Sequence, residues 1–372
     1  MKQGWEIIPF EDSIVKVKYT TKVPSNDYLD KGLYPIVSQE EGLVCGYWNN
    51  ANDLFKVSTP VVIFGDHTRI LKYIDFDFVL GADGVKILQP IENINAKFLK
   101  YYLQYCKIPS LGYSRHYKLL KELQVPVPPL PVQERIVSEL DLLSGIIEKK
   151  REQLKELDAL AQSIFYDMFG DPITNEKGWE VMKLGEVCKV NPSKKDTSIG
   201  LSNSDIVSFL PMEDLPIKAC YHSPKQTRLF SEVQSSYTCF ANIDVLKAKV
   251  TPCFEYGKIG IASNHMTGIV YGSSEFIVIR ANNIDVIKEY PYFVIQNTSF
   301  IENACAQLTG TSGLRRVPRQ YVENCNISIP PLPLHHHFAT KIEAIEKQKE
   351  LIKQSISETE TLFNARMQEH FG

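Results

Sequence analysis

Val127-Pro128-Pro129-Leu130-Pro131 recurs 202 residues later as Ile329-Pro330-Pro331-Leu332-Pro333. The same offset still holds some 40 residues further on, where Phe169-Gly170 matches Phe371-Gly372. Internal repetition in register indicates that one structural unit occurs twice along the chain. Each copy consists of a variable body, a proline-rich exit and a long segment that follows it.

The long segments carry apolar residues at alternating three- and four-residue steps, which is the pattern of a coiled-coil seam. The first series is interrupted only at Lys150, whereas the second is interrupted at Lys349 and is apolar at Ile352. Pro131 suits a helix start, and Gly170-Asp171-Pro172 suits a helix end. We expect the two helices to pair antiparallel; the alternative is that each packs only on its own body. The predicted coiled-coil residues are Leu140, Leu143, Leu154, Leu157, Ile342, Ile345, Ile352 and Ile356.

The two bodies have the pattern of mixed α/β structure. Compact apolar runs such as residues 61–64 and 275–279 predict buried strands between Gly, Pro, Asn and Asp turns. The sequence therefore predicts an α/β (α+β) protein with four segments. These are domain 1 (1–130), a central helix (131–170), domain 2 (171–331) and a C-terminal helix (332–372).

Net charge, cysteine spacing and the length of apolar runs limit the classes of function that the chain can have. The net charge is −3, of which the helical segments 132–170 and 332–372 contribute −3 and −1, so the bodies together carry +1. Nearly neutral bodies argue against tight nonspecific phosphate binding by the free chain, so DNA binding would need a partner's charge. The eight cysteines are scattered and predict free thiols. With no membrane-length apolar run and no signal core, we expect a cytoplasmic location.

Motifs for catalysis were not found. The chain has no phosphate-binding P-loop, no dinucleotide fingerprint and no nucleophile elbow. Asp244, Lys247 and Lys249 loosely resemble a metal-dependent nuclease motif, but the second acidic residue is missing. His335-His336-His337 cannot converge on one ion, because consecutive helical residues point in different directions. We predict no catalytic residue, no metal and no cofactor in this chain.

Loops rich in basic residues indicate a function more strongly than the catalytic motifs do. Loops at residues 66–69 and 112–118 of the first body, and at 247–258 and 309–316 of the second, combine glycine with Arg, Lys, His, Thr and Tyr. Arginine can make paired hydrogen bonds to guanine, and Lys, Ser, Thr and Tyr meet phosphates. A single loop of this kind could equally be a solvated surface. The predicted DNA contacts are Arg69, Arg115, His116, Lys118, Arg315 and Arg316, with His67, Lys247, Lys249, Lys258 and Arg319 as weaker candidates.

Several local patterns resemble one known family over essentially the whole chain. Gly-Trp-Glu opens each half, at residues 4–6 and 178–180, and Pro-Pro-Leu-Pro closes each body. Between them lie Ile63-Phe64-Gly65-Asp66-His67-Thr68-Arg69 and Asp244-Val245-Leu246-Lys247-Ala248-Lys249-Val250-Thr251-Pro252-Cys253-Phe254. Together these patterns resemble the specificity (S) subunit of type I restriction–modification systems.

The resemblance implies that each body is a target-recognition domain that reads half of a bipartite, asymmetric DNA sequence. It implies that the two helices form an antiparallel coiled-coil spacer with pseudo-twofold symmetry. The same resemblance implies docking of two methyltransferase subunits, which methylate adenine at N6 with S-adenosylmethionine. Two restriction subunits, which use ATP and Mg, can also join. The S subunit itself would be non-catalytic.

One departure and three alternatives stay open. Residues 334–337 replace the Gln-containing helix start that Val132-Gln133-Glu134-Arg135 shows in the first copy, and we expect any effect on docking rather than on DNA reading. The chain could instead be a self-sufficient nuclease with an unrecognised site, or a coiled-coil scaffold for proteins. Within the family, it could serve a modification-only system.

Overall fold

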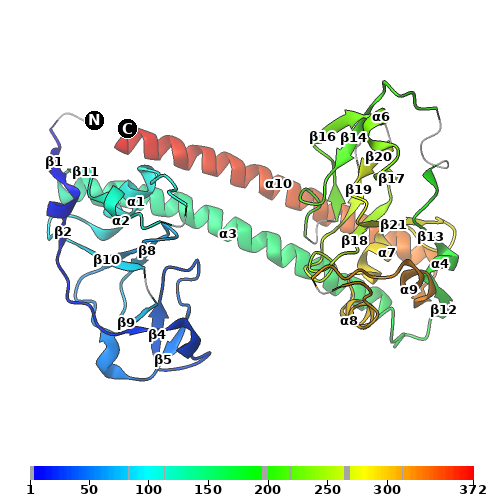
Figure 1. Cartoon of the computed structure of the whole chain (residues 1–372), viewed down its shortest axis with the longest axis horizontal. Coiled ribbons are helices and arrows are strands. Elements are labelled where there is room, and N and C mark those ends of the chain that lie inside the picture. Colours follow the sequence, from blue (N-terminus) through cyan, green and yellow to red (C-terminus); the bar gives the residue numbers. More distant parts are fainter. Residues whose placement is uncertain are drawn as a thin grey trace. The chain divides into compact units, whose positions relative to one another are not determined.

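The computed structural model describes residues 4–82, 84–112, 114–194, 200–217, 220–263, 269–311 and 313–372. Two compact units are present: unit 1 comprises Met1–Arg151 with Gln354–Gly372, and unit 2 comprises Glu152–Lys353. Each unit is a body of mixed helices and strands together with parts of both long helices (Figure 1). The predicted α/β class is confirmed. Tyr113 and Ser312, which belong to the predicted basic loops, lie outside the described residues.

Three sheets are formed by the residues of the unit 1 body that the structure describes. The first pairs β1 (Glu6–Pro9) with β11 (Gln124–Val127), which leads into the long helix. The second has the order β2 (Ile14–Val15), β10 (Val85–Pro90), β7 (Val61–Gly65), β8 (Leu71–Ile74). The third has the order β3 (Lys22–Val23), β9 (Phe78–Gly81), β4 (Tyr34–Val37), β5 (Gly46–Trp48), with β6 (Leu54–Phe55) also on β9. The helices are α1 (Ala96–Tyr105) and α2 (Tyr117–Leu120), with 3-10 turns η1 (Phe10–Ser13), η2 (Ser25–Asp27) and η3 (Ala51–Asp53).

The described part of the unit 2 body also forms three sheets. β12 (Glu180–Lys183) pairs with β22 (Asn326–Ile329) before the second long helix. The next sheet has the order β13 (Cys188–Val190), β21 (Phe276–Ala281), β18 (Val245–Ala248), β19 (Ile259–Ala262), β15 (Tyr221–His222). The last has the order β16 (Gln226–Leu229), β14 (Ile206–Leu210), β20 (Ile269–Gly272), β17 (Thr238–Ala241). The helices are α4 (Leu184–Val187), α6 (Phe230–Val233), α7 (Glu289–Val294), α8 (Thr298–Ala306) and α9 (Arg319–Asn324).

The two bodies share a strand plan. The order β2-β10-β7-β8 in unit 1 corresponds to β13-β21-β18-β19 in unit 2, with antiparallel pairing at every step. The parallel pair β4–β9 likewise corresponds to β14–β20. In the matched register Gly65 lies opposite Val85, and Ala248 lies opposite Phe276. The turn after β7 is therefore the counterpart of the loop after β18.

Local sequence explains the main elements. Strand β7 is apolar at four of its five residues and buried throughout, as expected of a strand covered on both faces. Helix α1 begins after Asn95, whose side chain accepts hydrogen bonds from the N–H groups of Lys97 (2.9 Å) and Phe98 (3.2 Å). Asn297 caps α8 in the same way, accepting from Phe300 N–H at 3.1 Å. Such caps satisfy the otherwise unpaired amides of a first helical turn.

In unit 1 the start of α3 (Leu130–Phe169) packs against the end of α10 (Leu332–Phe371). Phe371 enters the body core, with its ring 5.4 Å from that of Phe98. Glu139 forms an ion pair with Arg366 and a hydrogen bond with His370 Nε2, both at 2.9 Å. Further along, Arg151 pairs with Glu360 at 2.6 Å. The residue numbers rise on one helix as they fall on the other, so the pairing is antiparallel.

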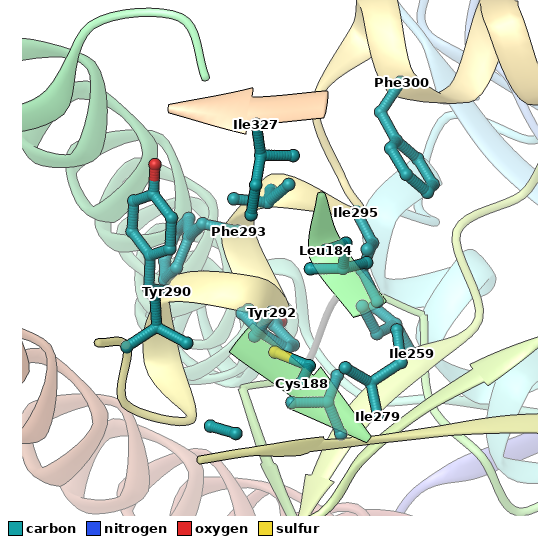
Figure 2. Packing of buried hydrophobic residues seen from close by; sticks show 14 of the residues in the cluster. Leu184, Cys188, Ile259, Ile279, Tyr290, Tyr292, Phe293, Ile295, Phe300 and Ile327 are labelled. Carbon is teal, nitrogen blue, oxygen red and sulfur yellow. The ribbon is translucent and has the colours of Figure 1, made fainter. Parts of the chain in front are cut away.

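Unit 2 contains the reciprocal pairing of the end of α3 with the start of α10. The Phe169 ring lies 5.1 Å from Phe338 and 5.2 Å from Tyr290. Figure 2 shows the adjoining core, in which Tyr290 and Phe293 of α7 lie near Leu184 of α4 and Ile327 of β22. Further along the helices, Asp158 pairs with Lys349 at 2.7 Å. In both units the helices therefore pair antiparallel, and neither helix packs on its own body alone.

The predicted seam residues are not equally buried. Leu140, Leu143, Ile342 and Ile345 are buried, whereas Leu154, Leu157, Ile352 and Ile356 are half-buried. The two lysines that interrupt the apolar series bind acceptors on the opposite helix. Lys150 Nζ donates to Ser355 Oγ and Thr359 Oγ1 in unit 1, and Lys349 Nζ pairs with Asp158 in unit 2. The interruptions in the pattern are thus polar layers of the helix pair.

Candidate nucleic-acid interface

The first candidate surface is the β7–β8 turn of unit 1. The turn closes through Arg69 N–H donating to the Gly65 carbonyl (2.7 Å) and Gly65 N–H donating to the Ile70 carbonyl (2.9 Å). Arg69 has a φ of 63°, a left-handed conformation that non-glycine residues seldom adopt and that is enriched at functional sites. Its side chain is exposed, and Nη1 donates to the Ile108 carbonyl at 3.0 Å.

A second loop is attached to this turn at Asp66. The backbone N–H of His116 donates to the Asp66 carbonyl (2.8 Å), and Tyr117 N–H donates to Asp66 Oδ1 (2.7 Å). His116 Nδ1 lies 2.9 Å from the Asp66 carbonyl oxygen, so Nδ1 carries the proton and donates it. His116 Nε2 accepts from Leu111 N–H at 2.9 Å. We call residues 66–70 and 108–118 the unit-1 edge.

His116 is fully buried, with both ring nitrogens engaged inside the protein. Contact between His116 and DNA stays a prediction, and its burial argues against it, because a base or phosphate could reach the ring only if the loop opened. Its neighbours Arg115 and Lys118 are exposed. His116 thus fixes the backbone from which these two cations extend.

The β4–β5 loop also reaches the unit-1 edge. Gln39 accepts a hydrogen bond from Thr68 Oγ1 through its carbonyl oxygen (2.7 Å) and one from His67 N–H through Oε1 (3.2 Å). His67 is half-buried and borders a concavity of about 420 Å³ that Lys22 and Ser25 also line. His67 therefore lies in a polar hollow rather than at the tip of the turn.

In unit 2 the corresponding loops are also joined. Thr251 N–H donates to the Arg315 carbonyl, and Val317 N–H donates to the Lys249 carbonyl, both at 2.9 Å. Val250 and Arg316 form a bridge between the same segments. We call residues 249–258 and 309–316 the unit-2 edge. Each body therefore presents a turn from its central hairpin attached to the loop that comes before its exit strand.

The cations of the unit-2 edge are more constrained than those of unit 1. Arg316 binds both carboxylate oxygens of Glu275, at 2.9 and 2.8 Å, and this hydrogen bonding lowers the pKa of Glu275. Lys249 Nζ donates to the Ser274 carbonyl (2.7 Å), and Lys258 Nζ donates to the Met212 carbonyl (2.8 Å). The side chain of Arg315 is exposed. Arg315 is therefore the best-placed cation of this edge for an external partner.

Two of the weaker candidates for DNA contact, Lys247 and Arg319, make contacts within the protein. Lys247 is buried, and its Nζ lies 4.6 Å from the centre of the Phe254 ring. Direct DNA contact by Lys247 therefore stays a prediction, and the burial of its side chain argues against it. Arg319 is exposed but pairs with Glu323 one turn along α9, at 2.7 Å. Sequence spacing cannot distinguish a lysine that faces the core from one that faces solvent.

The possible nuclease motif is an internal ion pair. Both carboxylate oxygens of Asp244 accept hydrogen bonds from Arg280, at 2.7 Å each, and Asp244 is fully buried. Within the described ranges, no group of three or more His, Cys, Asp or Glu side chains is arranged to hold a metal ion. Asp244 therefore has a structural role.

Sequence reasoning missed the acceptors that organise the edges. Gln39, Asp66 and Glu275 position the loops or hold their cations, yet none was a predicted site residue. Asp66 bonds to a segment 50 residues away along the chain. Asp66 follows a buried strand, which is the one sequence signal that could have singled it out.

Comparison with known proteins identifies the class. A family model described as "Type I restriction modification DNA specificity domain" matches residues 2–158 and 176–361. The chain therefore belongs to the type I restriction–modification DNA specificity family, with one matched region in each half. In the part of the chain that the structure describes, no helix has the length and apolar character needed to cross a bilayer.

Individual relatives agree with this assignment. The type I restriction enzyme EcoAI specificity subunit of Escherichia coli is 30% identical over 228 residues, covering 61% of this chain. The EcoEI specificity subunit of the same organism is 28% identical over 227 residues, covering 60% of this chain. In each case the match covers 38% of the relative, so the chain spans well under half of the length of these proteins.

Solved structures show the same fold. The type I restriction–modification S subunit from M. genitalium superposes with a TM-score of 0.55 at 12% identity, covering 99% of this chain and 96% of that one. A chain from a study of assembly of the type I restriction–modification system gives a TM-score of 0.52 at 14% identity, covering 100% and 98%. At such low identities the likeness is one of fold.

Proposed function

We propose that this chain is the DNA-recognition subunit of a type I restriction–modification complex. One observation carries the proposal: two bodies with the same strand plan each present joined loops with exposed arginines at the same place in that plan. Arg69 and Arg115 extend from the unit-1 edge, and Arg315 extends from the unit-2 edge. Exposed guanidinium groups on constrained loops suit both guanine edges and phosphates.

The two edges would read different sequences. In unit 1, Arg115 and Lys118 flank a buried histidine, whereas in unit 2 an arginine held by Glu275 follows Arg315. Because the side chains and their constraints differ, the target is bipartite and asymmetric, with one half-site for each body. The exposed cations of the two edges, together with His67 in its hollow and Arg319 at the start of α9, would contact DNA bases or the DNA backbone.

We assign the paired helices the role of spacer and docking element. A helix of 40 residues such as α3 is on the order of 60 Å long at ~1.5 Å per residue, comparable with one to two turns of DNA. Two methyltransferase subunits, and two restriction subunits where the system has them, would dock there. These partners would supply S-adenosylmethionine, ATP and Mg, so this chain would need no catalytic residue of its own. The complex would work in the cytoplasm.

Because the two bodies are nearly neutral, we expect this chain to bind DNA tightly only together with a partner subunit. Salt-dependent phosphate binding scales with the number of basic contacts, and the two bodies together carry only +1. A partner that encloses the duplex would supply the remaining attraction, and this chain would supply base selection. Its DNA binding should therefore be measured in the assembled complex.

The test is a map of methylated adenines in a host that expresses the chain with a cognate methyltransferase subunit, compared with the same host lacking the chain. We expect a bipartite motif with a fixed gap that disappears on deletion. An unchanged map, with the chain expressed and assembled, would overturn the proposal and favour a protein scaffold.

A further inference from the structure

Lys72 is a lysine in the interior of unit 1. It lies on β8, three residues after Arg69, and only 5% of it is exposed. Lysine is rarely buried to this degree, because removing an ammonium group from water is costly unless protein acceptors replace the water. Burial accordingly lowers the pKa of Lys72. The hydrogen bonds of the Lys72 amine identify the segment that it fixes in place.

The acceptors around Lys72 all belong to the loop between β4 and β5, residues 38–45. Lys72 Nζ donates to the carbonyl oxygens of Ser38 (2.8 Å) and Gly42, and it lies 3.8 Å from Cys45 Sγ. The loop also closes on itself, with Ser38 Oγ donating to Cys45 Sγ at 3.1 Å. The amine therefore occupies the centre of this loop and bridges its two sides.

The loop held by Lys72 is in turn bonded to the β7–β8 turn. Gln39, next to Ser38, accepts hydrogen bonds from Thr68 Oγ1 and His67 N–H. Lys72 is thus connected to the turn that carries Arg69 through two neighbouring residues of the loop, Ser38 and Gln39. Disorder in the loop would remove two of the contacts that fix this turn.

Unit 2 has a glycine at the position that matches Lys72. Lys72 lies opposite Ile63 in the β7–β8 ladder, and the matched position opposite Leu246 in the β18–β19 ladder is Gly260. Glycine has no side chain that could enter a neighbouring loop. Lys258, two residues before Gly260, donates instead to the carbonyl oxygens of Met212 (2.8 Å) and Glu213 (3.2 Å), in the loop after β14, the counterpart of β4. Each body therefore ties this loop with a lysine of its own, and a change at Lys72 affects the loop of unit 1 alone.

We propose that Lys72 is a positioning residue of the unit-1 edge, which fixes the β4–β5 loop against the β7–β8 turn and so determines recognition by one body only. This inference rests on the proposed function, since it assigns Lys72 an effect on the half-site that unit 1 reads. Lys72 would not itself contact DNA.

The test compares Lys72→Met, which keeps the apolar stem and removes the amine, with Lys56→Met, an exposed lysine of the same body. In the full chain, Lys72→Met should speed hydrogen exchange of backbone amides 39–45 by about tenfold or more, while β7 and β9 stay protected. In the assembled complex, discrimination against substitutions in one half-site should fall about tenfold, with the other half-site unaffected. Lys56→Met should change neither.

A second variant covers the case in which Lys72→Met does not fold. Insertion of one glycine after Gly42 keeps Lys72 but displaces an acceptor in an exposed loop, and it should give the same two effects. Unchanged exchange at residues 39–45 in either folded variant would overturn the positioning role. Faster exchange with intact discrimination would overturn the link to recognition. If the wild-type complex has no sequence preference, the proposed function fails, while the exchange data still decide whether Lys72 holds the loop.

Discussion

Gln133 and His335 occupy the same place in their two units, each in the first turn of a long helix and each fully buried. Gln133 Nε2 donates to the Pro128 carbonyl at 2.7 Å, and His335 Nε2 donates to the Pro330 carbonyl at 3.1 Å. Gln133 also binds Asn93 and Asn95 of its body, whereas the His335 ring lies 4.5 Å from that of Tyr290. His335 therefore belongs to the core of unit 2, and only its exposed neighbours could affect docking.

We predict that His335 makes unit 2 sensitive to acid. Burial lowers the pKa of His335 from its ordinary 6.5 to about 4, so the proton binds the unfolded chain more tightly than the folded one. The contribution of neutral His335 to the unfolding free energy of unit 2 is therefore fully present above pH 6.5, and it is lost as the pH falls towards 4. At about 1.4 kcal/mol for each unit of pKa difference, the full loss is roughly 3.5 kcal/mol, of which roughly 2.5 kcal/mol is reached at pH 4.5.

Denaturant unfolding at pH 7, 5.5 and 4.5 checks this prediction. His335→Gln, which introduces the residue found at the matching position of unit 1, should flatten the pH dependence of the unfolding free energy of unit 2. His337→Gln, on the exposed side of the same turn, should leave it unchanged. If His335→Gln retains the full acid sensitivity, another group is responsible.

We predict that Phe371 stabilises unit 1 far more than an average helix-terminal residue would. It is 8% exposed, and its ring lies within 6 Å of the rings of Phe98, Tyr102 and Tyr105. Phe371→Ala should lower the unfolding free energy of unit 1 by about 3–5 kcal/mol. Leu362→Ala, at a 45% exposed site of the same helix, should cost less than about 0.5 kcal/mol.

Hydrogen exchange resolved by unit provides the measurement, because two units need not unfold as a single two-state transition. Phe371→Ala should loosen the core strands of unit 1 and spare those of unit 2. Phe169→Ala, at the matching position, should do the reverse. Equal loosening of both units by either variant would contradict the assignment of each phenylalanine to one core.

The helices and the repeat could be predicted because periodic spacing and repeated motifs are local properties of a sequence. Even the polar layers at Lys150 and Lys349 were visible as interruptions, although their partners on the opposite helix were not. The shared strand plan of the bodies was hidden, because strand register depends on long-range pairing between dissimilar residues. The candidate site was only partly predictable for the same reason. His116 and Lys247 look like surface cations, and only the three-dimensional packing shows that both are buried.

We predict that Glu275 restrains DNA binding by Arg316. The paired hydrogen bonds with Glu275 occupy the guanidinium that would otherwise face a phosphate or base. Glu275→Gln should strengthen DNA binding by the assembled complex and steepen its salt dependence by about one released counterion. Glu323→Gln, which releases Arg319 in the same way, is the matched comparison. Binding titrations of both variants between about 50 and 200 mM salt would compare their affinities and salt dependences. Weaker binding by Glu275→Gln would contradict the prediction and would mean that Glu275 positions Arg316 for DNA.

Arg115 gives the sharpest test of base reading. Its backbone is fixed by the buried His116 beside it, while its side chain is exposed. If Arg115 makes paired hydrogen bonds to a guanine, Arg115→Ala should weaken binding by roughly 1–3 kcal/mol and relax the preference at one base pair of one half-site. Lys118→Ala, from the same loop, should weaken binding evenly across sequences. Duplexes with single base-pair substitutions along the mapped target would separate the two. An even loss for Arg115→Ala would make it a phosphate contact, and base selection by unit 1 would then fall to Arg69 at the neighbouring turn.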